Sequence, residues 1–174
     1  STVFTTHLFK KTRIDPQLEE ILGVPLEKIR ETETEYFQGL EKGTDFQYQA
    51  YATFLATKFA DVGGSASEHV IQELFENPEL YQDMLYPDVM PFVTALEDRG
   101  IHMGVYSEGY TDFQTHKITH TGLISHLEPT QIYIARRKQD HDVLAKLTTP
   151  SLIIDDKVEY LETLPPEVKG VWIN

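Results

Sequence analysis

The sequence of 174 residues predicts an α/β protein with a doubly wound parallel sheet of about five strands and an inserted α-helical segment. Two observations predict this fold class. From residue 87 onwards, short apolar runs alternate with helical patterns, as they do in proteins with parallel sheets. Residues 12–86 instead carry helical patterns without an intervening strand. The hydrophobic content of 40% excludes a wholly disordered chain and is sufficient for one core with an insertion.

The elements before residue 87 are predicted from composition and from helix start and stop signals. Residues 2–8 are β-branched and aromatic, which favours a short strand. Apolar residues at helical spacing over 26–40, followed by Gly43, predict a helix that ends there. Capping boxes at 44–47 and 65–68 predict two further helix starts, because a Ser or Thr oxygen there accepts from the first unbonded N–H groups.

The remaining elements alternate between helices and strands, and a third capping box at 111–114 is expected to begin one of the helices. The predicted helices span 88–99, 111–122, 141–147 and 157–164, and the predicted strands span 101–106, 131–135, 151–154 and 168–173. In a doubly wound sheet, ligands bind at the carboxyl ends of the strands.

The charge of the chain restricts the classes of partner. The net charge is −13, and residues 12–86 hold 15 acidic and 5 basic side chains. This surplus argues against a nucleic acid or an anionic membrane as partner, because the electrostatic interaction would be repulsive.

The sequence has no cysteine, which excludes a disulfide framework and a cysteine nucleophile and fits a cytoplasmic location. We also expect no transmembrane segment, since no apolar run is long enough to span a bilayer, and no secretory leader.

Polar side chains follow three of the predicted strands and form a candidate site. Ser107 follows the strand at 101–106, Lys138 follows the next strand, and Asp155 and Asp156 follow the strand after that. A hydroxyl and an ammonium group can hold phosphate oxygens, and paired carboxylates can hold Mg²⁺. The sequence therefore predicts a phosphate and magnesium site at this edge of the sheet.

Each of these side chains also has a purely structural interpretation. Ser107 can be a turn hydroxyl, and Lys138 lies in a run of three basic residues that is compatible with a solvated loop. Asp155 and Asp156 can cap the following helix, since acidic side chains stabilise helix N-termini. Both interpretations stay open for these residues.

The order of these motifs resembles the haloacid dehalogenase-like (HAD) superfamily. Its members carry an apolar strand ending in Ser or Thr, then a Lys, then an apolar strand ending in paired acids, which correspond here to Ser107, Lys138 and Asp155-Asp156. The resemblance implies a Rossmann-like core formed by residues 1–11 and 87–174. It also implies that the helical segment 12–86 is a cap inserted after the first strand.

The first motif departs from the family pattern. HAD hydrolases end their first strand in Asp-x-Asp, where the first Asp attacks phosphorus and the second is the general acid–base. Aligned on Val3-Phe4, these positions are Thr5 and His7. A threonine hydroxyl without an activating base is a poor nucleophile, and Mg²⁺ prefers oxygen ligands to histidine nitrogen. A histidine of the core or of a strand end is the structural alternative for His7.

The resemblance and this departure together predict a HAD-like protein with a degenerate active site. We expect it to lack phosphatase activity and to bind a small-molecule phosphate or a protein partner. The alternative is a magnesium-dependent phosphohydrolase that acts on a small phosphorylated substrate through an atypical first motif. In it, Asp155 and Asp156 would hold the metal, Ser107 and Lys138 the phosphate, and His7 would transfer the proton. Magnesium binding is expected to be weak, because the Asp pair is missing and Lys138 is nearby.

Overall fold

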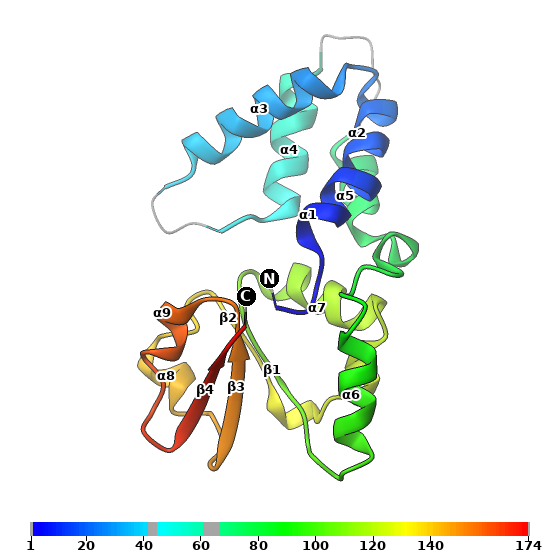
Figure 1. The fold of residues 1–174 in the computed structure, drawn as a ribbon. Helices are drawn as coiled ribbons and strands as arrows, with labels where there is room; N and C mark the ends of the chain where they lie inside the picture. The colour runs from blue at the N-terminus through cyan, green and yellow to red at the C-terminus, as the bar shows by residue number, and fades with distance from the viewer. Residues whose placement is uncertain (1, 42–44, 61–66, 174) are drawn as a thin grey trace. The chain divides into compact units, whose positions relative to one another are not determined.

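The computed structural model describes residues 2–41, 45–60 and 67–173, and the chain divides into two compact units (Figure 1). The helical unit spans Thr6–Gln82, and the α/β unit combines residues 1–5 with residues 83–174. Within the described ranges, no helix is long and apolar enough to cross a membrane.

The described residues of the helical unit form helices and connecting loops but no strand. Its elements are α1 (Thr6–Phe9), the π-helix η1 (Lys10–Ile14), α2 (Asp15–Leu22), α3 (Leu26–Gly39), α4 (Tyr48–Lys58), α5 (Glu68–Glu76) and the 3-10 helix η2 (Pro78–Tyr81). The expected insertion at 12–86 overlaps this unit, but the helical structure begins earlier, at Thr6. That this unit acts as a cap stays a prediction.

The predicted strand at 2–8 is wrong. Phe4 alone forms a β-bridge, an antiparallel one with Leu85, and the chain is helical from Thr6 onwards. The helical turns bury Phe9, whose ring centroid lies 4.7 Å from that of Tyr81. Strand propensity of a short segment depends on the surface against which it packs, and here the packing of Phe9 prevails over the β-branched composition.

The core of the helical unit is rich in aromatic side chains. Tyr36 packs against Tyr51 with ring centroids 5.1 Å apart, and Tyr48 stacks on Phe75 at 5.6 Å. The Tyr81 hydroxyl donates to the Phe75 carbonyl oxygen at 2.5 Å, which satisfies a buried polar group. These rings pack α3, α4 and α5 against one another.

The predicted helix caps of this unit are only partly within the described residues. Thr44 and Ser65, the expected capping residues of two boxes, lie outside them. Ser67 is the N-cap of α5, and its hydroxyl oxygen accepts from the Val70 N–H at 3.4 Å. The α5 helix therefore begins two residues later than the box predicts.

The α/β unit alternates helices with parallel strands, as predicted. Its helices are α6 (Val89–Glu97), α7 (Thr111–His120), η3 (Leu123–His126), η4 (Pro129–Gln131), α8 (His141–Leu144) and α9 (Val158–Leu161), and its strands are β1 (Val105–Glu108), β2 (Ile132–Ala135), β3 (Ser151–Asp155) and β4 (Val168–Trp172). Strand β1 pairs in parallel with β2, and β3 pairs in parallel with β4. The α/β class with parallel strands is thus confirmed.

The sheet differs from the prediction in its continuity. The described strands form two two-stranded sheets, β1–β2 and β3–β4, and no ladder joins β1 to β3. The expected five-stranded sheet included a strand at 2–8, which is absent. The core of this unit centres on Val89, Val93, Ile118 and Leu123, against which the apolar side chains of β1 and β2 pack.

Helix α7 begins differently from its prediction. Its N-cap is Tyr110, whose side chain makes no capping hydrogen bond, so the capping box at 111–114 is wrong. Gln114 instead accepts a hydrogen bond from the Ser107 hydroxyl at 3.4 Å. Gly109 makes this approach possible: its φ is +134°, and a Cβ there would lie 2.6 Å from the Gln114 side-chain nitrogen.

Lys117 gives this unit a pH-dependent stability. Its ammonium lies over the rings of Phe4 and Phe113, at 5.3 and 4.4 Å from their centroids, and burial lowers its pKa from 10.5 to about 8. Between these values the unfolded chain binds more protons than the folded one, so the free energy of unfolding gains a contribution as the pH rises.

Replacing Lys117 with methionine should remove this contribution. We expect Lys117→Met to raise the free energy of unfolding at pH 7 by about 1–2 kcal/mol, allowing for the partial exposure of the side chain. The difference in free energy of unfolding between the variant and the wild type should shrink between pH 8 and pH 10.5, because Lys117 of the folded wild type becomes neutral in this range. Urea denaturation of both proteins at several pH values measures it. Parallel pH profiles would contradict this account.

Candidate functional site

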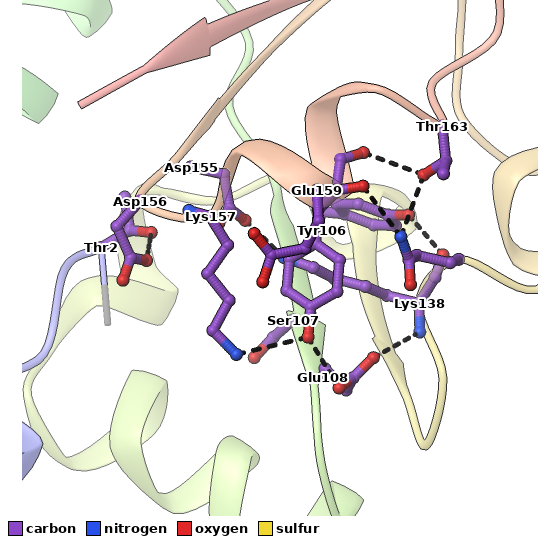
Figure 2. Close-up of polar contacts among 12 residues, drawn as sticks. Thr2, Tyr106, Ser107, Glu108, Lys138, Asp155, Asp156, Lys157, Glu159 and Thr163 are labelled. Atoms are coloured by element: carbon purple, nitrogen blue, oxygen red, sulfur yellow. Dashed lines mark hydrogen bonds and ion pairs between the residues drawn. The ribbon is translucent and has the colours of Figure 1, made fainter. Parts of the chain in front are cut away.

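A buried ion pair lies where strands β2 and β3 end. Lys138, just beyond β2, donates from its Nζ to the Oδ2 atom of Asp155, the last residue of β3 (Figure 2). The two side chains are only 5% and 6% exposed. Because a buried charge is unfavourable unless it is paired, each of these groups requires the other. The structure thus brings together two of the residues that the sequence singled out.

Two aromatic rings surround the ammonium group of Lys138. Its Nζ lies 4.1 Å from the ring centroid of Tyr160 and 4.9 Å from that of Tyr106. The hydroxyl of Tyr106 also donates to the Lys138 carbonyl oxygen. The negative faces of the rings attract the cation, so the rings and Asp155 together replace the water that burial removes.

Glu108 connects this cluster to the end of β1. Its Oε2 accepts from the backbone N–H of Lys138 at 3.2 Å, and its Oε1 accepts from the Tyr160 hydroxyl at 2.9 Å. Burial raises the pKa of Tyr106 to about 12, with smaller contributions from Asp155 and Glu108. Burial and the hydrogen bond to Glu108 also raise the pKa of Tyr160. Both phenols therefore stay neutral near pH 7 and act as donors.

Both carboxylates of the predicted acidic pair already accept hydrogen bonds. Besides Lys138, Asp155 accepts from the backbone N–H of Lys157 at 2.9 Å through Oδ1. Asp156 accepts from the Thr2 hydroxyl at 2.8 Å. Figure 2 shows these contacts on either side of the segment that follows β3.

This arrangement does not fit a magnesium ion. Asp155 uses both carboxylate oxygens, one of them for an ammonium group that would repel a cation. Among residues 2–41, 45–60 and 67–173, no group of three or more His, Asp or Glu side chains could hold a metal. The residues at this site therefore do not provide a magnesium site.

A solved structure shares this architecture. It is a haloacid dehalogenase-like family hydrolase from Xanthomonas campestris. The alignment covers 97% of this chain and 81% of the neighbour's chain, and its TM-score is 0.56. The chain has the HAD-like fold. Because the sequence identity is only 13%, the similarity establishes the fold and nothing about the activity. No family model and no curated protein matches the sequence.

Ser107 lies within β1, one residue before its last residue Glu108, and not after a strand at 101–106 as predicted, because the strand begins at Val105. Its side chain is half-buried, and its hydroxyl donates to Gln114 rather than to the ion pair. The distance of 3.4 Å makes this a long hydrogen bond, which a better acceptor such as a phosphate oxygen could replace.

The positions proposed for the missing Asp pair lose their basis. Their alignment assumed a strand at 2–8, which the structure does not contain. Thr5 donates from its hydroxyl to the Met84 carbonyl oxygen at 2.8 Å, and His7 lies in α1 of the helical unit. The N-terminal residue that does reach the acidic pair is Thr2, which contacts Asp156.

Sequence reasoning missed four residues of this site: Thr2, Tyr106, Glu108 and Tyr160. Tyr106 and Glu108 adjoin Ser107 in the sequence, so the same strand end predicts that both lie near the candidate site. Tyr160 follows the acidic pair in α9, where an apolar helix position gives no sign of a cation–π contact. Thr2 was read as part of a strand that does not form.

Proposed function

We propose that this HAD-like chain binds a phosphate-bearing small molecule at the ends of β1, β2 and β3 without hydrolysing it. The observation that carries the proposal is the buried Lys138, held between Asp155 and two aromatic rings. A lysine ammonium has three N–H donors, and Asp155 accepts one of them. The half-buried Ser107 hydroxyl is the donor from which a phosphate oxygen can accept a hydrogen bond, and the ammonium of Lys138 favours an anion over a cation at this edge.

The state of the carboxylates supports binding without turnover. Asp155 is paired with Lys138, Glu108 accepts from Tyr160, and Asp156 accepts from Thr2. A carboxylate whose oxygens are engaged by donors is a weaker nucleophile, because these donors stabilise its lone pairs. No described carboxylate of this cluster is therefore prepared to attack phosphorus.

The test measures phosphate binding and turnover in the same preparation. We expect inorganic phosphate to shift the amide NMR signals of Ser107 and Gly109 saturably. Replacing Ser107 with alanine should raise the Kd about tenfold, since a hydrogen bond to a charged group is lost. The matched control is Ser125→Ala, which removes an exposed hydroxyl bonded to Gly122 and should leave the Kd unchanged. No hydrolysis of p-nitrophenyl phosphate with magnesium is expected above the buffer rate.

The alternative is a magnesium-dependent phosphohydrolase, which is favoured by the description of the structural neighbour as a hydrolase. It requires Asp155 to exchange Lys138 for a metal. Hydrolysis that survives repurification and depends on added magnesium would establish this alternative. Equal phosphate affinity in the wild type and in Ser107→Ala would remove the support for the proposed site.

A further inference from the structure

A second polar site lies in the helical unit. A pocket of about 340 Å³ is lined by His7, Lys10, Lys11, Asp15 and Arg30. Its volume is at the lower end of the range of small-molecule sites. The sequence of residues 6–82 holds 14 acidic and 7 basic side chains, so a pocket with three permanent cations is unlike the unit around it.

The backbone at this pocket is unusual. Lys10–Ile14 forms a π-helix, a conformation that is rare and that recurs at functional sites. This π-helix contributes Lys10 and Lys11 to the pocket. The Nε atom of Arg13, in the same π-helix, is buried and has no hydrogen-bond partner within the described part of the chain. A buried donor without an acceptor is unfavourable, which adds to the unusual character of this π-helix, although Arg13 itself does not line the pocket.

Some of the cations are fixed in place by acids. Arg30 donates from Nη2 to the Oδ2 atom of the buried Asp15 at 3.1 Å. Lys10 lies 3.9 Å from the same carboxylate and donates to Glu33. Because long side chains lose rotamer freedom when they bind, cations that are already held reduce the entropy that a ligand must supply.

Lys11 leaves the pocket with an excess of positive charge. Asp15 and Glu33 balance Arg30 and Lys10, but neither the Lys11 nor the His7 side chain makes a hydrogen bond or ion pair with another described side chain. An arginine fork and lysine ammonium groups together match the oxygens of a phosphate or a carboxylate. The pocket therefore combines fixed and unengaged donors for an anion.

We propose that this pocket binds a small molecule through a phosphate or carboxylate group. The proposal is independent of the phosphate site at Ser107 and Lys138, which belongs to the other unit. It makes His7 a lining residue of an anion site instead of a group for proton transfer. The shared chemistry is that of a small oxyanion, and two probes distinguish its sources.

The test titrates the 174-residue chain with inorganic phosphate and, separately, with citrate, and follows the amide NMR signals of Lys10–Asp15. We expect saturable shifts with at least one probe, which identifies phosphate or carboxylate as the preferred group. Lys11→Met should raise the Kd of that probe about tenfold, because one charge-assisted contact is lost. Lys11 is exposed, so this variant should keep the wild-type melting temperature.

Lys28→Met is the matched control. Lys28 is an exposed lysine of α3 that pairs with Glu31 and does not line the pocket, so its loss should change the Kd less than twofold. Equal weakening by Lys11→Met and Lys28→Met would mean general charge attraction and would overturn the proposal. The absence of saturable shifts with both probes would overturn it as well. Shifts at Ser107 and Gly109 report separately on the phosphate site of the α/β unit.

Discussion

Replacing Asp155 with asparagine should lower the free energy of unfolding of the α/β unit by about 3–5 kcal/mol. The variant keeps the shape of the side chain but removes its charge, and it leaves the ammonium of Lys138 buried without a counter-charge. The rings of Tyr106 and Tyr160 compensate only part of that charge. Urea denaturation followed by circular dichroism measures the loss.

Two further variants separate the ion pair from general effects of substitution. Glu159→Gln removes an exposed carboxylate four residues further along the chain and should change the free energy of unfolding by less than about 0.5 kcal/mol. Adding Lys138→Met to Asp155→Asn should recover part of the stability, because no unpaired charge then remains. If Asp155→Asn is as mild as Glu159→Gln, the pair is not a buried ion pair in solution.

The buried pair also illustrates which part of the site the sequence could predict. Lys138 and Asp155 each follow a continuous apolar run, and parallel strands place their carboxyl ends at one edge of a sheet. Their proximity was therefore predictable. The sequence did not reveal that the two charges form a buried pair. That pairing depends on how far each side chain is buried, which the sequence pattern does not report.

The error at 2–8 has a different physical origin. The segment is too short for its composition to decide between a strand and a helix, and it has no periodicity that separates the two. Phe9 and Ile14 are almost fully buried in the helical unit, and helical turns bring both of them into its core. The packing of these two side chains therefore favours a helix over a strand in this segment. Local propensity does not report such packing. The alignment of Thr5 and His7 with an Asp pair assumed this strand, so it loses that support.

The helix starts were also harder to predict than the helices themselves. The capping box at 111–114 has the correct residue types, yet Tyr110 precedes α7 without a side-chain cap. Gln114, the last residue of the box, contacts Ser107 instead. A side chain that can accept from a helix N–H can also take part in a tertiary hydrogen bond, and the sequence does not distinguish the two.

Truncating Ile71 to alanine should lower the free energy of unfolding of the helical unit by about 2–5 kcal/mol. Ile71 is a fully buried residue of α5, a helix that contacts α4, so alanine leaves a cavity at that position. The matched control is Val70→Ala, which alters the neighbouring residue of the same helix at a side chain that is 39% exposed. It should cost less than about 1 kcal/mol.

Hydrogen exchange of the Ile71→Ala variant tests whether the two units are stabilised separately. Each unit has its own buried side chains, Leu55 and Ile71 in one and Val93 and Leu123 in the other. Amide protection should therefore fall in α4 and α5 and remain at the wild-type level in β3 and β4. An equal loss of protection in both sets would mean that the chain unfolds as one cooperative unit. In that case Asp155→Asn should also weaken protection in α4 and α5, so the two variants together determine whether the anion pocket and the phosphate site share one unfolding transition.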